Sequence, residues 1–90
     1  MDTTGLPGAE LIEEGLADLR AGRMSTSALL ALVGGPRLRR LGFDVPQGPQ
    51  DPEHRLYEAL AAEDQDSAHS RYNALVRRLV SFERAAECVR

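Results

Sequence analysis

Arginine is the residue type in this sequence whose number and spacing could support binding chemistry. All 11 basic residues are arginine, and the segment between Asp18 and Asp44 contains no acid. Five arginines lie in that segment: Arg20, Arg23, Arg37, Arg39 and Arg40. A guanidinium group forms paired hydrogen bonds with phosphate or carboxylate groups. If the parts of the chain that carry them are neighbours, the five form one basic patch for phosphate, nucleic acid or an acidic protein surface.

An internal role for the same arginines is an equal alternative. From Asp44 to Asp66 there are seven acids against the single base Arg55, and the part from Asp51 to Asp66 holds enough opposite charge to pair with the cluster. No aromatic residue lies among the arginines, which argues against binding of single-stranded nucleic acid. The net charge of −3 argues in the same direction.

The stretch from Leu30 to Leu38, LALVGGPRL, resembles the helix-hairpin-helix of DNA-repair proteins. In that family a glycine-rich hairpin presents backbone N–H groups to phosphates. The family places an apolar residue between its glycines, whereas Gly34 and Gly35 are adjacent here. The alternative is an ordinary turn between a buried helix and a short one.

The other reactive side chains form no catalytic or metal motif. His54, His69 and Cys88 are not at metal-ligand spacing, and the single cysteine cannot form an internal disulfide. There is no glycine-rich phosphate loop of the Walker or dinucleotide type, and 90 residues leave little room for a deep cleft. We therefore expect no enzymatic activity, no cofactor and no metal.

The elements that must position these residues are helices, because Leu and Ala dominate the apolar residues and Trp is absent. The longest helical pattern runs from Ser67 to Val89 and contains neither Gly nor Pro. Its apolar residues recur at three- and four-residue spacing, which places them on one side of a helix. They are Tyr72, Leu75, Leu79, Phe82, Ala86 and Val89, with Val76 and Val80 beside them.

That stripe is wider than the shorter helices can cover, so part of it should meet a partner. We expect a homodimer or a stable complex with another protein, with contacts through Tyr72, Val76, Val80 and Phe82. Glu83 lies at the edge of the stripe, where a carboxylate needs a partner. That partner is an arginine of the short helix or of a second subunit, unless the side chain is simply exposed at the rim.

The remaining elements are shorter. Residues 9–21 predict a first helix that ends at Gly22; Gly15 inside it costs about 1 kcal/mol against Ala and would permit close approach of another backbone. Residues 28–33 are apolar on every side, so this helix should be buried at the centre. A short helix follows at residues 36–41 and a loop at residues 43–50. Asp51 should cap the next helix, which begins at Pro52.

Together these patterns predict an all-α fold, a small compact bundle of four to five helices organised around the long C-terminal helix. Residues 1–8 are expected to be a flexible tail, and residues 9–90 a single helical domain. Without a signal segment or a long apolar run, the chain is expected to be cytoplasmic, with no membrane contact. The function favoured is a small non-enzymatic protein–protein interaction module. The alternative is a nucleic-acid-associated regulatory protein that binds phosphates through the arginine cluster.

Overall fold

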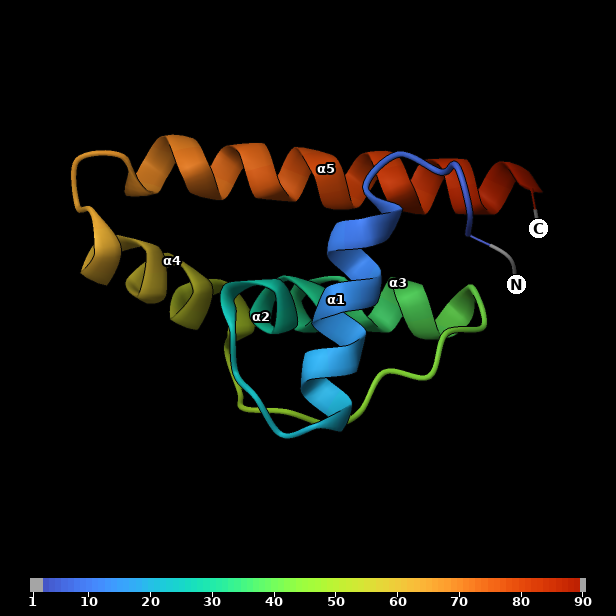
Figure 1. The fold of residues 1–90 in the computed structure, drawn as a ribbon, viewed down its shortest axis with the longest axis horizontal. Coiled ribbons are helices and arrows are strands. Elements are labelled where there is room, and N and C mark those ends of the chain that lie inside the picture. Colours follow the sequence, from blue (N-terminus) through green and yellow to red (C-terminus); the bar gives the residue numbers. More distant parts are fainter. Residues whose placement is uncertain (1–2, 90) are drawn as a thin grey trace.

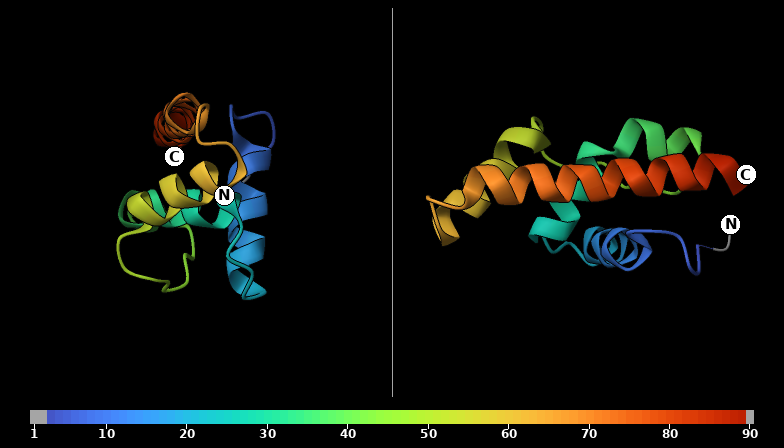
Figure 2. Two further views of the ribbon diagram at one scale, coloured as in Figure 1. Left: turned by 90° about the vertical axis from the view of Figure 1, so that its left-hand side faces the viewer. Right: turned by 90° about the horizontal axis from the view of Figure 1, so that it is seen from above.

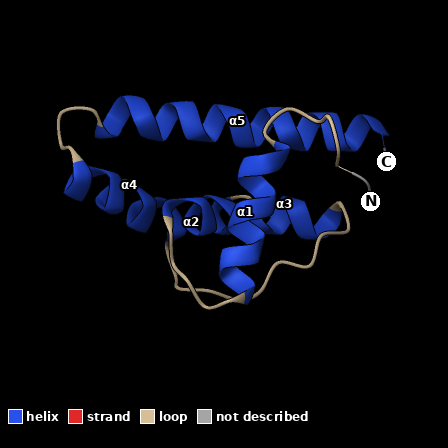
Figure 3. Ribbon diagram, viewed as in Figure 1, coloured by secondary structure: helices blue, strands red, loops and turns tan. Residues whose placement is uncertain are grey.

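The computed structural model describes residues 3–89, which form five helices and no strand (Figure 1; Figure 3). The all-α prediction is confirmed for this part of the chain. The helices are α1 (Ala9–Arg20), α2 (Thr26–Val33), α3 (Gly35–Arg40), α4 (Pro52–Glu63) and α5 (Ala68–Val89). No helix in the described range is both long enough and apolar enough to cross a bilayer.

Helix α2 is the centre of the packing. It contacts each of the other four helices, and its residues 27–32 are all buried. Leu30 is fully buried and Leu32 is 8% exposed, which confirms the expectation for both residues. A helix that is apolar on every side has no face that prefers water, so neighbours on all sides are its stable arrangement.

Helices α1 and α2 pack at unusually short range because Gly15 has no side chain. A Cβ atom at Gly15 would lie 2.2 Å from the Ser27 carbonyl oxygen and 3.2 Å from the Ala31 Cβ. The close backbone approach expected at this glycine is therefore confirmed. Helix α1 ends at Arg20, and Gly22 follows two residues later with a φ of 79°, a conformation that glycine adopts readily.

Helix α5 lies along the longest dimension of the molecule, and α4 folds back beneath its N-terminal half (Figure 1). Seen from above, α1 and α3 lie on opposite sides of α5 (Figure 2). The residues of α5 that are buried are Ala68, Leu79, Phe82, Glu83 and Ala86. Val89, the last residue of the predicted stripe, remains 59% exposed. The predicted long C-terminal helix is thus confirmed, although its covered face is narrower than the apolar stripe.

The start of α4 differs in detail from what the sequence suggests. Helix α4 begins at Pro52 as predicted, but the expected side-chain cap is wrong because Asp51 makes no capping hydrogen bond. Its φ of 58° is left-handed, whereas a capping side chain needs an extended backbone to reach the first turn. At the N-terminus, Thr3 is buried and its hydroxyl donates a hydrogen bond to the Glu13 carboxylate. Flexibility of residues 1–8 stays a prediction, and residues 1 and 2 lie outside the described range.

Candidate interaction surface

The predicted arginine cluster is not one open basic patch. Arg20 donates to the Asp44 carbonyl at 3.5 Å, and Arg39 donates to the Val45 carbonyl at 3.0 Å. Both guanidinium groups thereby hold the loop at residues 43–50 against the helices. Backbone carbonyls serve as acceptors here, so each of these two exposed side chains already has a role in holding the fold.

Arg23 is engaged at the turn between α1 and α2. Its Nη2 lies 3.0 Å from Asp18 Oδ1, while the Ser25 hydroxyl donates to the other carboxylate oxygen at 2.6 Å. The Ser25 oxygen also accepts the Ala28 N–H at 3.1 Å and so caps α2. The Ser25 hydrogen bond and then Arg23 lower the pKa of Asp18. The alternative that the cluster pairs with the acidic segment from residue 51 to residue 66 is therefore wrong for Arg23, whose partner Asp18 lies in α1.

Arg37 of α3 reaches the last helix. Its Nη2 lies 2.6 Å from Glu87 Oε2, and its Nη1 lies 3.7 Å from Glu83 Oε1. Glu83 is only 4% exposed, so burial raises the pKa of its carboxyl while Arg37 opposes that shift. This confirms that Glu83 finds its partner in an arginine of the short helix, which was one of the three alternatives.

The glycine pair at the start of α3 does not form a phosphate-binding nest. Gly34 has a φ of −83°, and its N–H donates to the Leu30 carbonyl within the helical pattern. A Cβ at Gly34 would lie 2.7 Å from Leu79 Cδ1 and 3.1 Å from Glu83 Oε2. The glycine therefore permits close approach of the α2–α3 turn to α5. The resemblance to a helix-hairpin-helix therefore does not extend to phosphate binding at Gly34, because the Gly34 N–H already donates to the Leu30 carbonyl.

Beside this turn lies a cleft between α3 and α5, with a volume of about 290 Å³. We call it the α3–α5 cleft. Its lining residues are Val33, Gly34, Pro36, Arg37, Arg40, Val76, Leu79, Val80 and Glu83. Val76 and Val80 are half-buried, whereas Leu79 is buried beneath them. The cleft thus joins an apolar floor from α5 to arginines from α3, and it unites two of the predicted partner contacts with two of the predicted basic residues.

The other two predicted partner contacts have places within the fold. Phe82 is fully buried, and its ring centroid lies 5.6 Å from that of Phe43. Its assignment as a partner contact is therefore wrong, because the loop after α3 covers it. Tyr72 is half-buried, with its ring centroid 5.8 Å from that of Tyr57 on α4. Burial, and then the charge of Glu53, raises the pKa of Tyr72.

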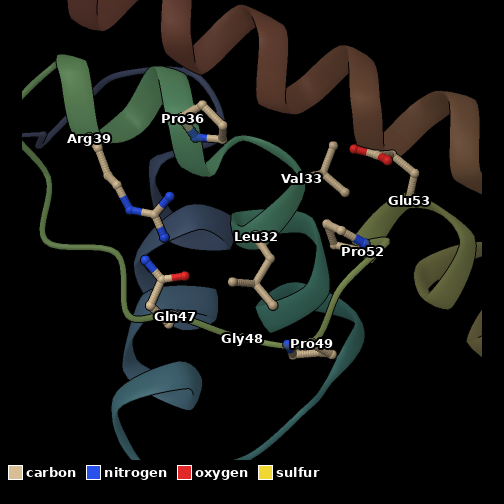
Figure 4. A pocket seen from close by; sticks show the side chains of 9 residues that line it. All are labelled: Leu32, Val33, Pro36, Arg39, Gln47, Gly48, Pro49, Pro52 and Glu53. Carbon is tan, nitrogen blue, oxygen red and sulfur yellow. The ribbon is translucent and has the colours of Figure 1, made fainter.

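A second hollow, of about 260 Å³, lies under the loop that joins α3 to α4 (Figure 4). Leu32 and Pro49 face its interior, and Arg39 points toward Gln47 at one side (Figure 4). The Arg39 guanidinium already donates hydrogen bonds to the Val45 and Pro46 carbonyls. Among the described residues, Arg39 is the one arginine that lines this hollow. The hollow therefore offers fewer groups for recognition than the α3–α5 cleft.

Within residues 3–89, no group of three or more His, Cys, Asp or Glu side chains is arranged to hold a metal ion. Comparison with family models, with curated proteins and with solved structures finds no match for this chain. The candidate surface is consequently defined by its own geometry and charge.

Proposed function

We propose that this chain is a small, non-enzymatic protein–protein interaction module that binds through the α3–α5 cleft, either to a second copy or as an accessory subunit of another protein. The observation that carries the proposal is the half-buried pair Val76 and Val80, which lines the cleft beside Arg37 and Arg40. Apolar side chains rimmed by charge at a concave surface are typical of protein interaction sites.

Photo-crosslinking in the native host tests this proposal. A photoreactive amino acid at Val80 should give a discrete adduct of higher mass, either with a second copy or with one other protein. The matched control places the same amino acid at Ala74, which is exposed elsewhere on α5. Equal crosslinking at both positions, or none at Val80, would contradict binding through the cleft.

The alternative proposal, a nucleic-acid-associated protein, has less support. Of the five arginines on which it depends, Arg20, Arg23, Arg37 and Arg39 already have partners. It predicts binding of a labelled oligonucleotide with an affinity that falls steeply with salt. Measuring that salt dependence against a variant with Val80→Asp separates the two, since phosphate binding has no need of the apolar floor.

A further inference from the structure

The α3–α5 cleft is bordered by arginines without a direct ion pair in the described part of the chain, of which Arg40 also acts at longer range to favour the charged form of Glu83. Arg40 lines the cleft and is exposed. On α5, the exposed residues Arg77 and Arg84 lie three positions before and four positions after Val80, so both are its neighbours on the helix surface. Within residues 3–89, none of these three arginines forms an ion pair.

The acids of the cleft are already occupied. Arg37 pairs with both Glu83 and Glu87, so a cationic partner would have to compete with an existing ion pair. The cleft and its border carry four arginines, Arg37, Arg40, Arg77 and Arg84. Against them stand two glutamates, Glu83 in the cleft and Glu87 beside it, so the region is net positive. An anionic partner gains from this field, because complementary charges at an interface raise the association rate and select the partner.

A second copy of the chain is a poorer occupant than a different protein. A twofold dimer built on this cleft would set the same positive border against itself, and like charges opposed across an interface are unfavourable. The chain's own acids between residues 51 and 66 lie on α4 and its connection to α5. Placing these acids in the cleft of a second copy, and that copy's acids in the first cleft, would require both regions to lie on one twofold interface of each chain.

We propose that the cleft binds a short acidic amphipathic helix of another protein. Two of its apolar side chains, one turn apart, would sit over Val76 and Val80, and its carboxylates would face Arg40, Arg77 and Arg84. A groove between two helices with an apolar floor is a common receptor for such a helix. The volume of about 290 Å³ suits a few side chains rather than a large cofactor. This inference rests on the proposed function and specifies its partner.

The test uses the full chain and a phage-displayed library of random peptides about 16 residues long, enough for four helical turns. Phage that still bind a Val80→Asp variant are removed, so the remaining peptides depend on the cleft. We expect these peptides to be rich in Asp and Glu around a pair of apolar residues. The selected peptides are then synthesised with a fluorescent label, and their affinities are measured by anisotropy.

Charge reversal supplies the decisive comparison. The triple variant Arg40→Glu, Arg77→Glu and Arg84→Glu should bind the peptides about tenfold or more weakly, since each exposed charge contributes a modest amount and three are reversed. The matched control is Arg78→Glu, which is exposed on the same helix but two residues from Val80 and so on another face. It should change the affinity by less than about twofold. Circular dichroism checks that each variant is folded.

Five outcomes would overturn this partner assignment. The selected peptides could be basic or neutral, or their affinity could be unchanged in the triple variant. Either result refutes the acidic partner and leaves the proposed function intact. If the chain forms a concentration-dependent dimer that dissociates in the Val80→Asp variant, the occupant of the cleft is a second copy. The acidic partner is then refuted and the proposed function is kept. An oligonucleotide could bind the wild type and the Val80→Asp variant equally well and lose affinity when Arg40, Arg77 and Arg84 are reversed. That result would assign these arginines to nucleic-acid binding. A library that yields no peptide dependent on Val80 contradicts both the partner and the proposed function.

Discussion

Replacing Gly15 by Ala tests the packing that positions α2, and through α2 the rest of the fold. In an exposed helix this change stabilises a protein by about 1 kcal/mol. Here the added Cβ would lie 2.2 Å from the Ser27 carbonyl oxygen. That oxygen belongs to the backbone of a buried helix and cannot rotate away. Helix α2 must retreat by roughly 1 Å before the contact becomes an ordinary van der Waals one.

The expected loss of stability follows from the side-chain contacts that weaken when α2 moves away from α1. Ile12, Leu16 and Leu19 are buried on α1, the helix that carries Gly15. A gap of about 0.5–1 Å forfeits a quarter to a half of each contact's attraction, which is roughly 1–6 kcal/mol for one well-packed Leu if all of its contacts are loosened. Since the gap is shared over several side chains, this loss exceeds the gain in helix propensity. We expect the Gly15→Ala variant to be less stable by about 2–4 kcal/mol.

Urea denaturation followed by helical circular dichroism measures this change in the free energy of unfolding. Two controls calibrate it. Ala17→Gly, at an exposed position of α1, should cost about 1 kcal/mol through propensity alone. Gly34→Ala should cost about 1 kcal/mol or less, because the nearest obstacle is the flexible end of Leu79 at 2.7 Å. A Gly15→Ala variant more stable than the wild type would refute the close α1–α2 packing.

The other predictions concern burial, capping and pH. Leu30→Ala should cost about 2–5 kcal/mol in the same denaturation assay, and a loss below about 1 kcal/mol would contradict its burial. Ser25→Ala should cost about 0.5–2 kcal/mol because Ser25 caps α2, whereas Asp51→Ala should change stability by less than about 0.5 kcal/mol. Since burial raises the pKa of Glu83, the folded state binds its proton more tightly than the unfolded state does. The stability of the wild type relative to Glu83→Gln should therefore fall as pH rises from about 4.3, the unfolded value, to the raised folded value; a pH-independent difference would contradict the raised pKa.

Helix positions were predictable because local signals agree with one another. The six-residue apolar run from Ala28 to Val33 stands between serine and threonine residues and a Gly-Gly pair. Such a run has few stable arrangements other than a buried helix, and α2 has that place. Gly15 pointed to close approach of another backbone without establishing it, since a glycine inside a helix can also simply weaken that helix. These features depend on residues near in sequence, where periodicity and capping carry most of the information.

Partners that come from far along the chain were not predictable. Periodicity places Phe82 on the apolar stripe but cannot tell that Phe43, from an irregular loop, will cover it. The acceptors of Arg39 are backbone carbonyls, which every residue type supplies, so no sequence pattern marks them. The role of Asp51 was misjudged because residue type does not report the left-handed φ that turns its side chain from the helix.

Glu83 is where the chain departs furthest from what stability alone would favour. An apolar residue at this nearly buried position would continue the stripe of α5 and gain about 1.5–3 kcal/mol from burial. A carboxylate there must instead be desolvated, and Arg37 at 3.7 Å offsets only part of that cost. The pair connects α3 to α5 through charged side chains, and both residues line the α3–α5 cleft. Gly34 lets the α2–α3 turn approach α5 closely at this point, since a Cβ there would press on Leu79 and Glu83. A buried ionisable group at the wall of an open cleft is a recurrent mark of a functional surface, and this is why we place the partner here rather than in the hollow beneath the α3–α4 loop.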